Sequence, residues 1–298
     1  MDIRKLGANN ASLAGFSLDD AIAKLLDMGF YTIELLAWEG AVHSQGELAG
    51  YGFDDMSPAE RDRLRAAVEP FGHVATHLPF VEMPLFTYNR PLAAFVKEQF
   101  KVGIEGTGFL GGETATLHVW PRAQRDVHEY WSDMVDTFRE LADHGARWDV
   151  KVAIETMFPR SIDEFVGLIA DVDRPNFGAN VDVGHLTGCT DVRATAADRG
   201  TPAAEQRYME CLLRLLGRLG DKLFHLHLHD VRREDWRDHR ATGRGFLDFD
   251  AIMAKLVEMG YPHLLTFELE EPDVVPALAE SKRFIEAAIA RVGTPAGK

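Results

Sequence analysis

Residues 224–230 read FHLHLHD and place three histidines, His225, His227 and His229, at every second position. Successive side chains of a β-strand point to opposite faces, so the three imidazoles share one face and the leucines between them share the other. Imidazoles in a dry core are costly unless each finds a partner. The stretch therefore predicts a strand that ends at a polar pocket, where histidines bind a metal or hydrogen-bond the groups that do. The alternative interpretation is a polar-lined strand with one satisfied core histidine.

Outward from this strand, short apolar strands alternate with amphipathic helices along the whole chain. The other predicted strands are residues 3–8, 31–36, 74–78, 114–119, 150–155, 177–182 and 264–269. The predicted helices cover residues 17–29, 57–71, 91–105, 126–147, 161–172, 201–219, 248–259 and 274–292. A glycine-rich loop at residues 39–55 is predicted to be an insertion over one end of the fold.

This alternation predicts the fold class. Strands separated by helices pair in parallel, and eight such units close a barrel. We therefore expect an α/β fold, a (β/α)8 TIM barrel formed by a single domain that spans residues 1–298. An open doubly wound sheet is the main rival. Its nucleotide-binding forms lack support, because no GxGxxG follows the first strand and no GxxxxGK[ST] occurs.

The composition limits the class of partner. The chain carries a formal net charge of −15 and two cysteines, Cys189 and Cys211. Contact with phosphates needs a basic stripe, so we expect no nucleic-acid or anionic-membrane partner. Two cysteines give neither a disulfide framework nor a CxxC metal site. The N-terminal residues have no apolar signal core and no run approaches the ~18 residues of a membrane span, so a cytoplasmic location is expected. The sequence leaves formation of a homo-oligomer open.

Reactive side chains recur at the C-terminal ends of the predicted strands, where TIM barrels hold their active sites. One face of each strand is apolar, and the other passes through small or polar residues to a reactive one. These residues are Glu34, His77, His118, Glu155, Asp182, the histidines of 225–229 and Glu268. A lone strand-end glutamate is more often a salt-bridge partner, but seven strands converging on one end predict an active site.

Glu155, Asp182, one histidine of the central strand and Glu268 together offer three carboxylates and one imidazole. This set suits one divalent metal ion, with Mn²⁺ expected first and Mg²⁺, Co²⁺ or Zn²⁺ as alternatives. Without a cation, three buried carboxylates would repel and raise one another's pKa values. The alternative is that the acids pair with basic residues, but Lys151 is the only inward one on the predicted strands. Periodicity alone does not choose among the three histidines.

Five motifs, in this order and spacing, resemble the xylose-isomerase-like TIM barrel superfamily, which includes sugar isomerases and epimerases, inosose dehydratases and the endonuclease IV branch. They are VAIETM at 152–157, NVDVGH at 180–185, HLHLHD at 225–230, HRATGRGFLDFDAI at 239–252 and LTFELE at 265–270. The resemblance covers nearly the whole chain. For the ketose 3-epimerase branch, it implies a single metal held by Glu155, Asp182, His227 and Glu268. It also implies that His185 and Arg233 contact the substrate.

The endonuclease IV branch has a three-metal site, and eight residues fall where its ligands would lie. They are His77, His118, Glu155, Asp182, His185, His227, His239 and Glu268. The departure is Arg237, which stands where that branch has an aspartate and would repel a metal. Asp238 is adjacent, but it points elsewhere if the local backbone is extended. Phosphodiester cleavage is therefore the poorer interpretation. His77, His118 and Glu34 are predicted to bind substrate; the two histidines can instead support the metal ligands or simply pack.

The expected metal ligands and the family resemblance together predict a divalent-metal-dependent sugar isomerase or epimerase that acts on a ketose or related polyol. The expected chemistry is proton abstraction next to a carbonyl through a metal-bound enediolate, with the metal acting as a Lewis acid. Glu155 and Glu268 are the expected catalytic pair, one removing a proton and the other returning it. An inosose-type dehydratase would use the same site. An endonuclease IV-like multi-zinc phosphodiesterase and a non-catalytic sugar-binding barrel are the other hypotheses.

Overall fold

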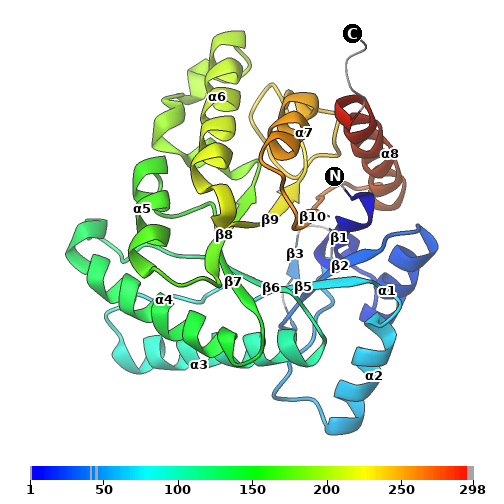
Figure 1. Cartoon of the computed structure of the whole chain (residues 1–298), viewed down its shortest axis with the longest axis vertical. Coiled ribbons are helices and arrows are strands. Elements are labelled where there is room, and N and C mark those ends of the chain that lie inside the picture. The colour runs from blue at the N-terminus through cyan, green and yellow to red at the C-terminus, as the bar shows by residue number, and fades with distance from the viewer. Residues whose placement is uncertain (1, 41, 44–45, 294–298) are drawn as a thin grey trace.

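Eight parallel strands form a closed barrel in the computed structural model, which describes residues 2–40, 42–43 and 46–293. Around the barrel the strands follow the order β1, β10, β9, β8, β7, β6, β5 and β2 (Figure 1). Their bounds are β1 Leu6–Asn9, β2 Thr32–Leu36, β5 His73–His77, β6 Thr114–Leu117, β7 Lys151–Glu155, β8 Phe177–Asp182, β9 Leu223–Leu228 and β10 Leu264–Phe267. The predicted single-domain TIM barrel is confirmed.

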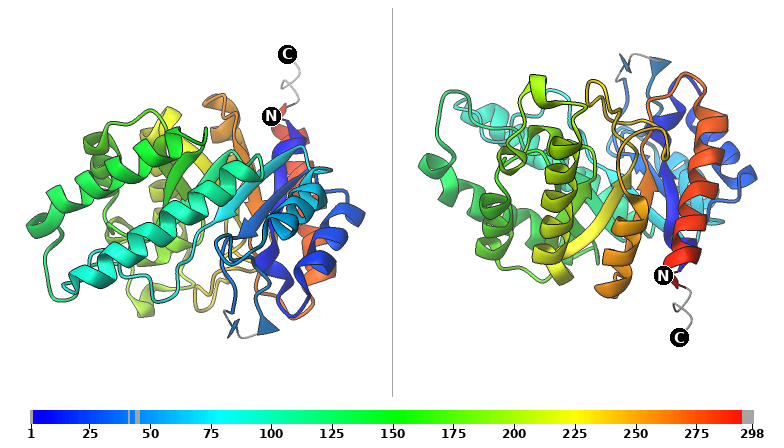
Figure 2. Two further views of the ribbon diagram at one scale, coloured as in Figure 1. Left: turned by 90° about the horizontal axis from the view of Figure 1, so that it is seen from below. Right: turned by 90° about the horizontal axis from the view of Figure 1, so that it is seen from above.

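Helices surround the strands, as the two further views show (Figure 2). They are α1 Leu18–Asp27, α2 Pro58–Val68, α3 Arg90–Phe109, α4 Trp131–Ala146, α5 Ile162–Val172, α6 Pro202–Leu219, α7 Phe249–Glu258 and α8 Val274–Gly293. Several begin where a side chain caps the first turn, which satisfies backbone N–H groups that have no partner within the helix. The hydroxyl of Ser17 accepts from the backbone of Asp20, and Ser57 forms a capping box with Glu60.

The strands divide their side chains between two environments. Leu226 and Leu228 of β9 are fully buried in the hydrophobic core, as are Ile154 of β7 and Val181 of β8. The residues between them face the barrel interior, which carries many polar side chains. All of these are buried: Glu34, His77, Thr116, Glu155, Asn180, Asp182, His225, His227 and Thr266. Many of these side chains hydrogen-bond one another, but some of their buried atoms have no hydrogen-bond partner among the described residues. Because such an atom is costly to bury, these atoms point to a bound group.

Three segments differ from the predicted elements or add to them. The first strand starts at Leu6, because Ile3–Lys5 forms a 3-10 turn in which Asp2 accepts from the backbone of Arg4 and Ile3 is exposed. The 39–55 loop carries a short antiparallel pair, β3 Val42–His43 and β4 Gly46–Glu47, while residues 41 and 44–45 lie outside the described part. Residues 185–198 form three successive 3-10 turns between β8 and α6.

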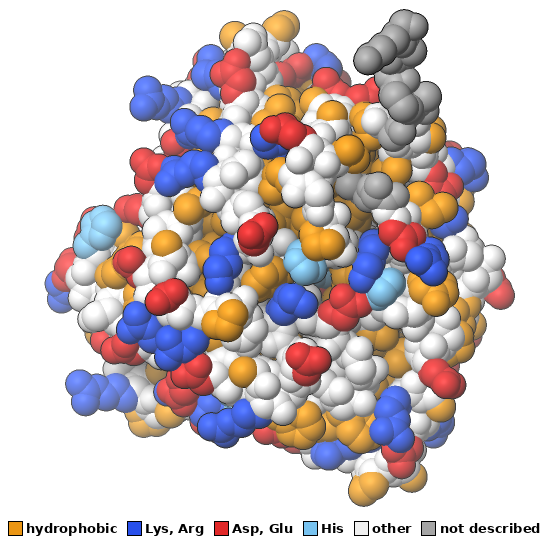
Figure 3. All heavy atoms as spheres, viewed as in Figure 1, with side chains coloured by type: hydrophobic (Ala, Val, Ile, Leu, Met, Phe, Trp, Pro, Cys, Tyr) orange, Lys and Arg blue, Asp and Glu red, His pale blue; other side chains and the backbone are white. Residues whose placement is uncertain are grey.

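The molecular surface mixes both signs of charge. On the face shown in Figure 3, acidic and basic side chains are interspersed, and no continuous basic stripe crosses it. Among the described residues, no helix combines the length and the apolar character that a membrane span requires.

Candidate metal centre at the barrel mouth

Four predicted ligands come together at the C-terminal ends of β7, β8, β9 and β10. The Nδ1 atom of His227 lies 2.7 Å from Glu268 Oε2, 3.5 Å from Glu155 Oε2 and 3.7 Å from Asp182 Oδ2. Two donor atoms that bind one ion at about 2.1 Å lie roughly 3.0–3.4 Å apart at octahedral or tetrahedral angles. The observed separations bracket that range. Ligand atoms of Glu155, Asp182 and His227 also lie within 4.8 Å of one another, so one ion fits among these three side chains, with Glu268 beside His227.

The unsatisfied atoms of the site also fit a cation. Glu155 Oε1 and His227 Nδ1 are buried and receive no hydrogen bond of acceptable geometry from the described residues. Burial opposes ionisation of Glu155, but the neighbouring His118 and His227 outweigh it and hold its pKa well below the usual range. Burial likewise opposes ionisation of Asp182, and His185 and His229 hold its pKa low. The site therefore keeps its carboxylates charged, as a divalent ion requires.

The backbone after β8 fixes two of these groups. Asp182 Oδ1 accepts from the backbone N–H of Gly184 at 2.8 Å and of His185 at 3.0 Å. This turn directs the His185 ring back toward Glu155, whose Oε1 lies 2.9 Å from His185 Nδ1. Residue 184 must be glycine because a Cβ atom there would collide with the His229 ring. The D-x-x-H motif is thus a single local unit that positions an acid and an imidazole together.

More imidazoles surround Glu155. His77 Nε2 lies 3.2 Å from its Oε2, and His118 Nε2 lies 3.3 Å from its Oε1. The described residues give four groups of possible ligand atoms, each within 4.8 Å, and one of them, Glu34, His225 and His227, is buried in the barrel interior. The other three overlap around Glu155 and Asp182. They are His77, His118 and Glu155; Glu155, Asp182 and His227; and Asp182, His185 and His239. The site can therefore hold one cation among Glu155, Asp182 and His227, with Glu268 next to His227, and has imidazole-rich flanks on both sides.

A cavity of about 470 Å³ opens above these groups. Its floor is polar, with Glu155, His118, His185, His239 and Glu268. The other lining residues are mostly apolar: Ala11, Leu48, Phe80, Val81, Trp120, Met157 and Leu269, together with the acidic Glu82 and Glu270. The volume and the mixture of apolar and polar lining suit a small polar molecule.

A family model for xylose isomerase-like TIM barrels matches residues 22–288 of the chain. The chain belongs to this family. The uncharacterized protein MJ1311 of Methanocaldococcus jannaschii is 24% identical, with 90% of this chain and 93% of that protein covered. A D-tagatose 3-epimerase-like protein has a similar structure, with a TM-score of 0.73, 19% identity and coverage of 97% and 98% of the two chains. The IOLI protein, solved with a bound zinc atom, has a TM-score of 0.66, 20% identity and coverage of 96% and 97%.

In this xylose isomerase-like barrel, three of the predicted substrate contacts, Arg233, Glu34 and His77, are not among the residues that line the cavity. Arg233 is half exposed, and its guanidinium donates to Glu205 Oε2 of α6 at 2.6 Å. Glu34 is fully buried in the barrel interior, where its Oε2 lies 2.9 Å from His227 Nε2. His77 is also buried and contacts Glu155, whereas His118 and His185 line the cavity. Substrate contact by Arg233, Glu34 and His77 therefore stays a prediction that the cavity does not support.

The sequence predicts that Asp238 points elsewhere if the local backbone is extended, but the backbone at His239 is not extended. His239 has a φ of 55°, in the left-handed region, and its Nδ1 lies 3.2 Å from Asp238 Oδ1. Asp238 therefore contacts the imidazole instead of pointing away. Burial opposes protonation of His239, but Asp238 and Asp182 outweigh it and raise the His239 pKa to about 10. Arg237 lies 3.7 Å from Glu270, at the rim of the cavity.

Sequence reasoning left the roles of His229 and Asp230 unassigned. His229 Nδ1 accepts from the backbone N–H of His239 at 2.8 Å, so its Nε2 carries the proton and donates to Asp182 Oδ1 at 2.7 Å. It therefore orients one predicted ligand. The i, i+2 spacing of the histidines was the only sequence signal for this role, and it did not separate His229 from its neighbours.

Asp230 anchors the loop of residues 231–247. Its Oδ1 accepts from the backbone N–H groups of Val231 and Leu247, and its Oδ2 accepts from those of Gly243 and Gly245, all at 2.8–3.1 Å. A Cβ atom at residue 245 would collide with this carboxylate, which explains the glycine. Burial raises the pKa of Asp230, while the backbone donors act in the opposite direction. The loop carries His239, so Asp230 holds one flank of the site in place.

Proposed function

We propose that this chain is a divalent-metal-dependent sugar isomerase or epimerase acting on a ketose or a related polyol. The observation that carries the proposal is the convergence of three carboxylates on His227 Nδ1, at 2.7–3.7 Å, where two of them, Glu155 and Glu268, also line a cavity large enough for a sugar. The similar structures support it, since they include a D-tagatose 3-epimerase-like protein. An inosose-type dehydratase on the same site is the close alternative.

Glu155, Asp182, His227 and Glu268 would hold the ion. Mn²⁺ is the ion that we expect first, because three carboxylates and one imidazole suit a hard-to-borderline cation. Zn²⁺ is the alternative that the zinc-bound IOLI structure supports. A bound divalent ion supplies Lewis-acid polarisation of a carbonyl, worth several kcal/mol in reactions that build negative charge on oxygen.

Glu155 and Glu268 are our candidates for the two proton-transfer groups. Both line the cavity, and they come from β7 and from the residue after β10, with β8 and β9 between them in the barrel. They therefore reach the cavity from different directions. One takes the proton next to a substrate carbonyl, and the other returns a proton to the enediolate. The imidazole of His185, 2.9 Å from Glu155 Oε1, is placed to hold that proton or to orient the carboxylate.

The cavity also suggests the kind of sugar. No lysine or arginine occurs among its lining residues within the described part of the chain. Phosphate groups are bound by such residues or by helix N-termini. The aromatic rings of Phe80 and Trp120 instead offer apolar surface to the C–H face of a ring or chain. We infer an uncharged, non-phosphorylated ketose or polyol.

The experiment that tests the proposal follows solvent exchange by proton NMR in deuterated buffer, across a panel of free ketoses and inososes. With Mn²⁺ loaded and then removed before acquisition, or with Mg²⁺ throughout, we expect deuterium at the carbon next to the carbonyl of at least one ketose, together with its epimer or isomer. Prior treatment with EDTA is expected to abolish the exchange, and added Mn²⁺ to restore it. Exchange that persists without metal, or none with any panel member, contradicts the proposal.

A second candidate function rests on the three overlapping groups of possible metal ligands. Three ions in one site suit a phosphodiesterase of the endonuclease IV type. Arg237 argues against it, because it stands where that branch has an aspartate, and its guanidinium lies 3.7 Å from Glu270 instead of offering a ligand. Metal content after dialysis separates the two candidates. We expect one ion per chain by plasma emission spectroscopy, and three zinc ions per chain would favour the phosphodiesterase.

A further inference from the structure

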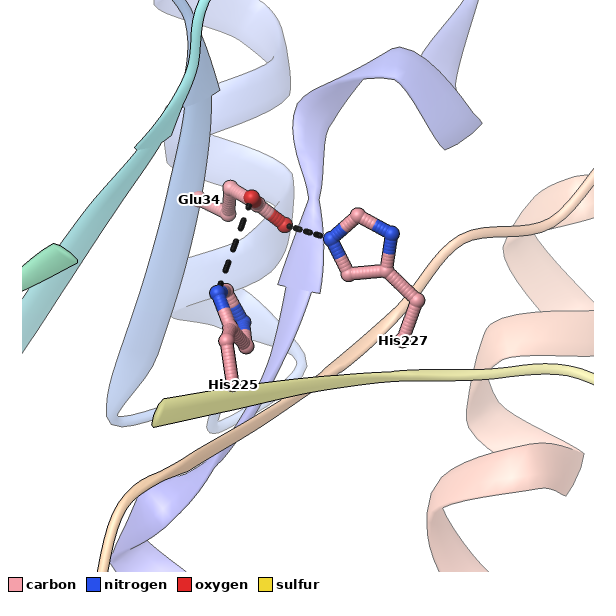
Figure 4. Close-up of side chains that lie close together, drawn as sticks. All are labelled: Glu34, His225 and His227. Carbon is pink, nitrogen blue, oxygen red and sulfur yellow. Dashed lines mark ion pairs between the residues drawn. The ribbon is translucent and has the colours of Figure 1, made fainter. Parts of the chain in front are cut away.

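Glu34 of β2 lies directly behind the proposed metal ligand His227. Its carboxylate is fully buried in the barrel interior, away from the cavity lining. Its Oε2 is 2.9 Å from His227 Nε2, and its Oε1 is 3.8 Å from His225 Nδ1 (Figure 4). The two nitrogens of His227 therefore face opposite ways, Nε2 toward Glu34 and Nδ1 toward Glu155, Asp182 and Glu268.

Other donors surround the same carboxylate oxygen. Thr266 Oγ1 donates to Glu34 Oε2 at 2.8 Å, and Asn9 Nδ2 donates to it at 3.3 Å. The Thr266 hydroxyl has one hydrogen, which it donates to Glu34. It therefore accepts a hydrogen bond from His225 Nε2, which lies 2.9 Å away. His225, Thr266 and Glu34 thus form a directed chain that ends on the carboxylate. Because Glu34 Oε2 accepts several hydrogen bonds, it is a carboxylate oxygen that carries no proton.

This arrangement selects one tautomer of His227. A carboxylate only accepts hydrogen bonds, and carboxylates face both nitrogens of His227, Glu34 at Nε2 and Glu268 at Nδ1. An ion in the proposed site would take the Nδ1 lone pair, which leaves the proton on Nε2, where Glu34 accepts it. Asn180 Nδ2 also lies 2.9 Å from His227 Nε2, but its N–H has Glu155 Oε2 as another acceptor at 3.3 Å. A charge-assisted bond is about twice as strong as a neutral one, so Glu34 decides the tautomer.

We propose that Glu34 is a positioning residue that fixes the proton of His227 on Nε2 and aims the Nδ1 lone pair at the metal site. The inference rests on the proposed metal centre. A carboxylate behind a histidine ligand holds the ring in orientation and increases its basicity, and the loss of such a partner typically costs 10–100-fold in metal affinity. This positioning role differs from the substrate contact that the sequence predicts for Glu34, and it agrees with the full burial of the side chain.

The variant Glu34→Gln tests this role. Glutamine keeps the shape of the side chain, but its amide N–H can donate to His227 Nε2 and so favours the wrong tautomer. Calorimetric titration of the metal-free protein with Mn²⁺ is expected to show affinity lowered by about 10–100-fold. The matched control is Glu113→Gln, a half-buried carboxylate before β6 that contacts Lys5 and His73 at the other end of the barrel. The control is expected to stay within about twofold of the wild type.

A second measurement uses the unchanged protein. In ¹⁵N-histidine-labelled, Zn²⁺-loaded wild type, we expect long-range ¹H–¹⁵N spectra to show His227 protonated at Nε2 and metal-bound at Nδ1. The signal is assigned by its loss in His227→Gln. A proton on Nδ1 overturns the proposal, even if Glu34→Gln fails to fold. A folded Glu34→Gln variant with affinity within twofold of the wild type also overturns it. If wild type binds neither Mn²⁺ nor Zn²⁺, the proposed metal centre fails as well, so the two failures are distinguishable.

Discussion

The variant Glu155→Gln is expected to lower kcat on the substrate that the NMR panel identifies by about 10³–10⁴-fold. The amide cannot take up a proton, and a positioned acid or base typically contributes 10²–10⁴ in rate. The change also removes one negative charge from the proposed ligand set, next to His227, His118 and His185. The measurement is initial rate at saturating substrate and saturating Mn²⁺, with bound metal quantified in the same sample.

Two comparisons separate catalysis from metal binding. Glu140→Gln, on the outer surface of α4 where Glu140 pairs with Lys97, is expected to leave kcat within about threefold. If Glu155→Gln still binds one Mn²⁺ per chain at saturation, its rate loss reports proton transfer. Activity above a tenth of wild type in such a metal-loaded variant would refute the assignment of Glu155 as the acid or base.

The largest stability effect is expected for Asp230→Asn. Each carboxylate oxygen of Asp230 accepts two backbone N–H bonds, so whichever oxygen becomes an amide nitrogen then faces two donors. A buried donor without an acceptor costs about 1–3 kcal/mol, so the free energy of unfolding is expected to fall by about 3–5 kcal/mol. In a chain of this size, that corresponds to a Tm lower by roughly 5–15 °C, measured by circular dichroism.

The matched control for this substitution is Asp248→Asn, at the residue that directly follows the loop of residues 231–247. Asp248 is exposed and caps α7 by accepting from the backbone of Ala251 at 3.0 Å. Asparagine caps helices about as well as aspartate, so we expect the free energy of unfolding to change by less than about 0.5 kcal/mol. Equal losses for the two variants would show that the loop of residues 231–247 does not depend on Asp230.

The sequence was informative wherever side-chain alternation decided the geometry. Glu155 and Asp182 are the last residues of their strands and Glu268 directly follows β10, so parallel pairing brings all three to one end of the barrel. Alternation could not distinguish the three histidines of residues 225–229, because it gives them the same face. The structure distinguishes the three histidines by their positions along the strand, which give each one different partners. His225 reaches Thr266, His227 reaches Glu34 and the acids, and His229 reaches Asp182.

The geometry of the loops could not be predicted from the sequence, for a different reason. The anchoring of residues 231–247 on Asp230 uses backbone N–H groups, which every residue except proline has, so no pattern of side chains marks it. The left-handed conformation of His239 likewise cannot be recognised from the residue type, although it decides where Asp238 points. For the same reason, the ion pair of Arg233 with Glu205 depends on the course of a loop that strand periodicity does not define.

The polar interior of this barrel has a consequence for protein engineering. TIM barrels usually fill this space with layers of branched aliphatic side chains, which tolerate exchange of one for another. Here His225, Thr266 and Glu34 are linked through the Thr266 hydroxyl, which accepts from His225 and donates to Glu34. A half-satisfied polar network is worse than an apolar core, so a library that redesigns the barrel should vary these three positions as one unit.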